Sequence, residues 1–122
     1  MKIKKLNCII PLVIYPFDIM FSFNQTDDEL RKEFKKYMID ESNYFEHPFV
    51  KGRCSQFPTG QIIIRLRDYP ETNRHYGFLQ HEIYHAVNYL MSFIGTKYSD
   101  DSEECYAYLI AYITEQIYGK LK

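Results

Sequence analysis

A chain of 122 residues is long enough for one domain with a modest hydrophobic core. Hydrophobic residues make up 46% of it and charged residues 25%, which is the balance of an ordinary globular protein rather than of a disordered or membrane-spanning one. The formal net charge of −1 leaves no strong basic surface, so we expect no nucleic-acid partner.

The first apolar segment follows three lysines and predicts a strand over residues 6–15. It is too short to span a bilayer, holds Pro11, and lacks the small-x-small cleavage site of a signal peptide. The three cysteines are far apart and odd in number, which favours free thiols in a reducing compartment over disulfides. We therefore expect a cytoplasmic protein with no membrane partner.

Alternating apolar residues predict a second strand over residues 18–24, after a bend at residues 15–17. Thr26 is followed three positions later by Glu29, which is the sequence of a capping box. A helix is therefore expected to begin there and to end near residue 40. Its apolar face contains Leu30, Phe34 and Met38.

Residues 53–67 predict a β-hairpin around the turn Pro58-Thr59-Gly60. The second arm alternates between an apolar face and a mostly polar one, and its arginines suit an exposed edge strand. A peptide can pair with the free backbone of such a strand, and Ile63 and Arg65 are then the expected substrate contacts. In the alternative interpretation this arm is an ordinary paired strand of the sheet.

Residues 81–85 read His-Glu-Ile-Tyr-His and match the pattern H-E-x-x-H. On a helix, residues four apart lie one turn apart on the same face, so His81 and His85 can converge on one zinc ion. Glu82 flanks that ion and is placed to accept a proton from a water bound to it. The pattern predicts one Zn²⁺ per chain, with Glu82 as the catalytic residue.

The surrounding sequence predicts that this pattern lies on a helix over residues 73–94. Its apolar residues recur at steps of one, three and four and lie roughly opposite the two histidines. Thr72 provides a start and Gly95 a stop. His75 lies off the ligand face, so we expect it near the helix start and facing solvent, with a substrate contact as the alternative.

Catalytic zinc sites usually take three protein ligands, so a third is expected from another element. A second helix is predicted over residues 102–118, with Asp100, Asp101 and Ser102 available to cap it. Glu104 lies on this helix one turn before the small residue Ala107, which allows a close approach to the first helix. Glu103 is the rival, and spacing separates the two only weakly.

An H-E-x-x-H followed about twenty residues later by a glutamate on a second helix resembles the gluzincin branch of the zincin metallopeptidases. Glu104-Cys105-Tyr106-Ala107 fits the Glu-x-x-Ala form of that family, and Glu103 does not. The resemblance is closest to small zincin domains of bacteria, phages and mobile elements, including ImmA/IrrE-like proteins. It implies that His81, His85 and Glu104 bind zinc, and that substrate adds to the strand before the metal-binding helix.

The sequence therefore predicts a single α+β domain over residues 1–122, with a small, twisted, mostly antiparallel sheet and three main helices. The predicted function is zinc-dependent hydrolysis of peptide bonds in a peptide or protein substrate. The alternative is a catalytically idle zincin-fold protein that binds a peptide or protein partner. A side-chain hydroxyl or imidazole is expected to stabilise the oxyanion of the reaction. The candidates, left open, are Tyr84, Tyr106, Tyr108 and Tyr112.

Overall fold

The computed structural model describes residues 3–12, 15, 17–39, 43–47 and 49–121. Its elements in chain order are β1 (Leu6–Pro11), β2 (Asp18–Phe23), α1 (Asp27–Lys36), the short 3-10 helix η1 (Tyr44–Glu46), β3 (Gly52–Gln56), β4 (Ile62–Leu66), α2 (Asn73–Phe93) and α3 (Glu103–Lys120). The predicted α+β class with three main helices is confirmed. Residues 13–14 of the first expected strand, and Pro16 of the expected bend, lie outside the described residues.

The four strands form one mixed sheet in the order β1-β2-β4-β3. β1 and β2 pair in antiparallel fashion, as do β3 and β4, whereas β2 and β4 run parallel. Two of the three pairings are therefore antiparallel. The predicted hairpin is β3–β4, closed by a turn in which the Gly60 amide donates to the Phe57 carbonyl at 2.8 Å.

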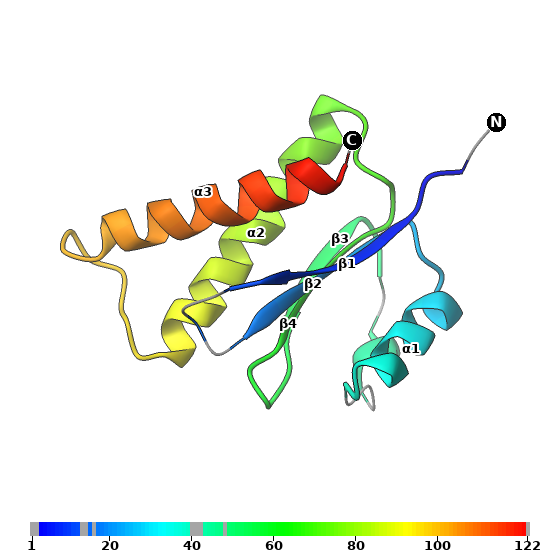
Figure 1. The fold of residues 1–122 in the computed structure, drawn as a ribbon, viewed down its shortest axis with the longest axis horizontal. Helices are drawn as coiled ribbons and strands as arrows, with labels where there is room; N and C mark the ends of the chain where they lie inside the picture. Colours follow the sequence, from blue (N-terminus) through cyan, green and yellow to red (C-terminus); the bar gives the residue numbers. More distant parts are fainter. Residues whose placement is uncertain (1–2, 13–14, 16, 40–42, 48, 122) are drawn as a thin grey trace.

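Helices cover both faces of the sheet, with α2 and α3 on one side and α1 on the other (Figure 1). The larger core lies between the sheet and the α2–α3 pair, and a smaller one lies under α1. Alternate strand residues point into the two cores, because successive side chains of a strand face opposite sides. In β4, for example, Ile64 enters the larger core and Ile63 the smaller one.

β4 is not an edge strand, so that prediction is wrong. It lies between β2 and β3, and its residues are all buried. Ile63 and Arg65 face α1, on the side of the sheet opposite α2. The guanidinium of Arg65 donates to Asp27 Oδ1 at 2.8 Å and lies over the Phe49 ring. Neither residue is placed to contact a substrate at α2, and the strand edge nearest α2 belongs to β3.

The capping box predicted for α1 is confirmed and ties the helix to the N-terminal segment. The Glu29 carboxylate accepts from Lys5 Nζ at 2.8 Å and from the Thr26 amide at 2.9 Å. These donors, the Lys5 ammonium first, hold the pKa of Glu29 at about 2 instead of 4.5. They stabilise the charged form of an exposed group, so the contribution to stability is screened by solvent.

Replacing Glu29 by glutamine is expected to destabilise the protein at neutral pH and to have little effect near pH 2. A lowered folded-state pKa contributes stability that is present above the unfolded value of 4.5 and is lost as the pH falls towards about 2. Urea unfolding of the wild type and of Glu29→Gln across this range measures the difference. A difference in unfolding free energy that stays constant with pH would contradict the lowered pKa of Glu29.

Within the described part of the chain, no helix combines the length and the apolar character needed to cross a membrane.

Candidate metal centre

The helix that carries the H-E-x-x-H segment is fixed at both ends by local interactions. At its start, Thr72 Oγ1 accepts from the His75 amide at 3.1 Å, and His75 Nδ1 accepts in return from the Thr72 amide at 3.4 Å. At its end, Gly95 adopts a φ of 84°, a conformation that favours glycine. His75 lies at the helix start, as the sequence predicted. The structure adds that it caps the helix there. α2 ends at Phe93, one residue before the predicted boundary.

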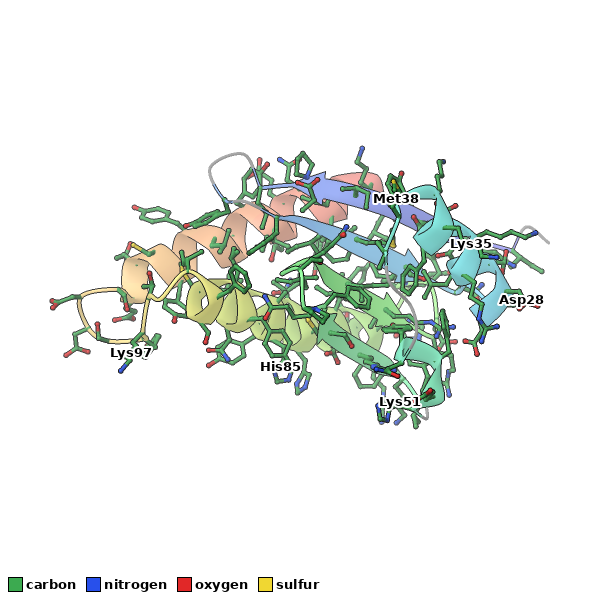
Figure 2. All side chains as sticks on the ribbon, turned by 90° about the horizontal axis from the view of Figure 1, so that it is seen from below. Asp28, Lys35, Met38, Lys51, His85 and Lys97 are labelled. Carbon is green, nitrogen blue, oxygen red and sulfur yellow. The ribbon has the colours of Figure 1, made fainter. Side chains whose placement is uncertain are left out.

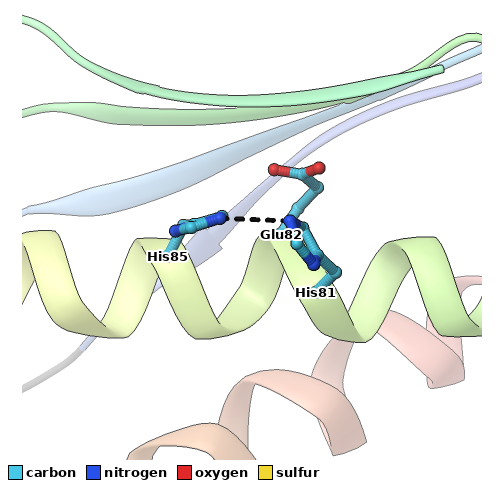
Figure 3. Close-up of side chains that lie close together, drawn as sticks. All are labelled: His81, Glu82 and His85. Atoms are coloured by element: carbon cyan, nitrogen blue, oxygen red, sulfur yellow. Dashed lines mark hydrogen bonds between the residues drawn. The ribbon is translucent and has the colours of Figure 1, made fainter.

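The two histidines of α2 project together from one face of the helix (Figure 3). Nε2 of His81 and Nε2 of His85 are 3.1 Å apart. His81 is exposed and His85 partly so, and Figure 2 shows His85 projecting from the surface of α2. The pair is open to an ion arriving from solvent.

The spacing of these nitrogens fits one tetrahedral zinc ion. Zinc bonds to histidine nitrogen at about 2.0–2.1 Å, so two such ligands at the tetrahedral angle are about 3.3 Å apart. The observed 3.1 Å differs from this by a few tenths of an ångström, which a small ring rotation supplies. The residues present therefore fit two positions of a zinc site.

Glu82 lies beside the histidines but turns towards the sheet (Figure 3). Its residue is 8% exposed, and no described residue donates a hydrogen bond to its carboxylate. Burial raises the pKa of Glu82 above 4.5, while the nearby His81 and His85 lower it to a smaller extent. A carboxylate with a raised pKa beside two imidazoles is a functional candidate.

Among the described residues, the group able to hold a metal consists of His81, Glu82 and His85, whose ligand atoms lie within 4.8 Å of one another. Glu104 does not belong to it. Tyr106, two residues later, donates its hydroxyl to the Thr96 carbonyl, beyond the end of α2. Glu104 is exposed near that end, so the structure does not bring it to the histidines as its spacing predicted.

The role of Glu104 as third ligand stays a prediction from the zincin resemblance. If it is correct, Glu104→Ala weakens zinc binding at least tenfold, and the matched variant Glu103→Ala does not. Competition with a chromogenic chelator measures both affinities. Equal zinc affinity in the two variants and the wild type would show that Glu104 stays outside the His81–Glu82–His85 group when zinc is bound.

The edge strand β3 runs alongside α2. Just before β3, the Lys51 ammonium lies 5.5 Å from the centre of the Phe78 ring of α2. A Cβ atom placed on Gly52, the first residue of β3, would lie 3.1 Å from Glu82 Oε2. The strand therefore begins within contact distance of the α2 turn that carries His81 and Glu82.

The register of the hairpin shows which backbone groups of β3 are free. The Arg67 amide donates to the Lys51 carbonyl at 2.9 Å, and the Phe57 amide donates to the Gln61 carbonyl at 2.8 Å. Bonded pairs alternate along an antiparallel ladder, so residues 51, 53, 55 and 57 bond inward to β4. The amides and carbonyls of Gly52, Cys54 and Gln56 consequently point away from β4, to an edge that pairs with no other described strand, and their side-chain positions face α2.

The four tyrosines considered for oxyanion stabilisation differ in their hydrogen bonds, their exposure and their distance from the site. The hydroxyls of Tyr106 and Tyr112 are bonded to the carbonyls of Thr96 and Pro11. Tyr108 is 72% exposed on α3. Among the four, Tyr84 is the one whose ring lies near the described site, with its centroid 6.1 Å from that of His85.

Sequence reasoning missed Tyr89. Its ring is stacked at 26° to that of His85, with the centroids 6.4 Å apart. Tyr89 is half-buried and follows His85 by four residues, so it lies on the same stripe of α2 as His81 and His85. That i, i+4 spacing was the signal available in the sequence.

Comparisons with protein-family models, with curated proteins and with solved structures give no match to this chain. The zincin resemblance stays a prediction. The case for a metal site therefore depends on the geometry of His81, Glu82 and His85.

Proposed function

We propose that this protein is a zinc-dependent peptidase. The observation that carries the proposal is the group formed by His81, Glu82 and His85. It joins two imidazole nitrogens 3.1 Å apart to the carboxylate of Glu82, a residue that is 8% exposed, and all three ligand atoms lie within 4.8 Å of one another. Two imidazoles one helical turn apart, with a carboxylate beside them, are the part of a hydrolytic zinc site that the H-E-x-x-H pattern supplies.

His81 and His85 would hold the metal through Nε2. Zinc, when bound, lowers the pKa of a water molecule towards neutrality and polarises the carbonyl of the substrate. Glu82 accepts the proton of the attacking water and later donates it to the leaving amine. Burial suits Glu82 to both steps, because a raised pKa brings its proton affinity closer to that of the groups it exchanges with.

The open edge of β3 supports a peptide as the substrate. Its free amides and carbonyls at Gly52, Cys54 and Gln56 match the spacing of an extended peptide backbone. β3 starts beside Glu82, so a peptide paired with this edge would pass close to the histidine face of α2. The substrate contacts predicted at Ile63 and Arg65 are thereby replaced by backbone contacts on β3.

A mixture of unstructured peptides incubated with zinc-loaded protein tests the proposal. We expect new peptide termini by mass spectrometry, lost after zinc is removed with a chelator and restored when zinc is added back. A protein that binds zinc but produces no new termini from any peptide would contradict peptidase activity. It would favour the alternative of a peptide-binding protein.

A further inference from the structure

Gly52 occupies a position in β3 where glycine is not required by the backbone. Its φ lies outside the left-handed region that other residues avoid. Glycine within a strand weakens it, because it has no side chain to pack and loses more conformational freedom on folding. Such a glycine marks a place where another group approaches the backbone closely.

The groups that approach Gly52 are the Glu82 carboxylate and the Leu66 side chain. A Cβ atom at residue 52 would lie 3.1 Å from Glu82 Oε2, 3.5 Å from Glu82 Cγ and 3.0 Å from Leu66 Cδ2. The first and last distances are shorter than ordinary van der Waals contacts. Leu66 is 2% exposed and packed in the larger core, so the carboxylate end of Glu82 has more freedom to move.

We propose that Gly52 is a positioning residue for Glu82. The missing side chain leaves the space in which the carboxylate lies against the edge strand, next to the backbone that would hold the substrate. A methyl group at this position displaces the carboxylate from that place. The inference rests on the proposed function, in which this carboxylate exchanges the proton.

Kinetics of Gly52→Ala measure the effect on turnover, with Gly77→Ala as the matched control. Gly77 lies on an exposed part of α2, and an added Cβ there meets nothing within 4 Å. A misplacement of about 1 Å at a reacting group costs roughly a hundredfold in rate. We expect kcat of Gly52→Ala to fall about tenfold, with zinc content and KM unchanged, and Gly77→Ala to behave as wild type. An unchanged kcat, or a rise in KM alone, would overturn the proposal.

A double-mutant cycle in thermal stability tests the same contact without any activity. The Tm change caused by Gly52→Ala is measured in the wild type and in Glu82→Ala, both free of metal. The Leu66 contact is present in both backgrounds and cancels. We expect the Tm change caused by Gly52→Ala to be more favourable in the Glu82→Ala background than in the wild type, by roughly 2–4 °C. Equal changes would show that the methyl group does not displace Glu82.

The two measurements separate the failure of this inference from that of the proposed function. Absence of peptide cleavage by wild type removes the peptidase proposal, while the cycle still reports whether Gly52 makes room for Glu82. If the wild type cleaves peptides but the two substitutions have additive effects on Tm, the peptidase proposal stands and the positioning role of Gly52 is rejected.

Discussion

Replacing His85 by alanine is expected to abolish zinc binding at micromolar metal. Structural zinc sites with four ligands bind with about 10–16 kcal/mol, so one ligand accounts for about 3 kcal/mol, or more than a hundredfold in affinity. In the proposed site His85 and His81 hold one ion through Nε2 atoms that are 3.1 Å apart, and one imidazole cannot replace two. Metal analysis of protein purified without chelator should give close to one zinc per wild-type chain and none for His85→Ala.

The control for this experiment is His47→Ala, which removes an exposed imidazole outside the His81–Glu82–His85 group. It should retain zinc at the wild-type level. Added zinc should raise the Tm of the wild type and of this control, because a ligand bound only by the folded state stabilises it. His85→Ala should show no such rise. Wild-type protein that takes up no zinc, even after incubation with the metal, would leave His81 and His85 as ordinary helix residues.

Local sequence patterns predicted the elements well, because the interactions that form them are local. The capping box of Thr26 and Glu29 is present, and the apolar stripe of α2 is buried opposite the histidines. The pairing of His81 and His85 follows from helix geometry alone, since residues four apart share a face. These features depend on neighbours within one or two helical turns.

The errors concern contacts between residues distant in the chain. The alternation in β4 identified its apolar face, but not that β2 would pair with β4 in parallel and leave β3 at the edge. The polar-looking face of β4 is covered by α1, where Asp27 neutralises Arg65. The position of Glu104 depends in the same way on how α3 crosses α2. Spacing after Gly95 does not determine that crossing.

Gly52 shows why part of the site was beyond sequence reasoning. Gly52 comes just before the strand that was predicted to begin at residue 53, so the sequence suggests only a loop residue there. Its importance depends on the approach of Glu82, thirty residues later, which appears only when β3 is placed beside α2. The grouping of His81, Glu82 and His85 was therefore predictable from five consecutive residues, whereas the close approach of β3 to Glu82 was not.

Replacing Glu82 by glutamine is expected to separate metal binding from turnover. Glutamine has nearly the same shape, but its amide does not accept the proton of the attacking water. Loss of a positioned general base typically costs 10²–10⁴ in rate, so we expect kcat to fall by about that factor while zinc content stays at the wild-type level. If Glu82→Gln also lost its zinc, Glu82 would be a ligand, a role that its distance from the histidines permits.

The same variant should be more stable than the wild type when both are free of metal. Burial raises the pKa of Glu82 in the folded state above 4.5, so ionised Glu82 opposes folding at neutral pH. That cost disappears as the pH falls below 4.5, where the carboxyl group is protonated in both states. Urea unfolding should show a stabilisation by Glu82→Gln at neutral pH that shrinks in acid. A destabilised variant at neutral pH would mean that the carboxylate has a favourable partner in solution. Greater stability with lost turnover would identify Glu82 as a residue retained for chemistry at the expense of the fold.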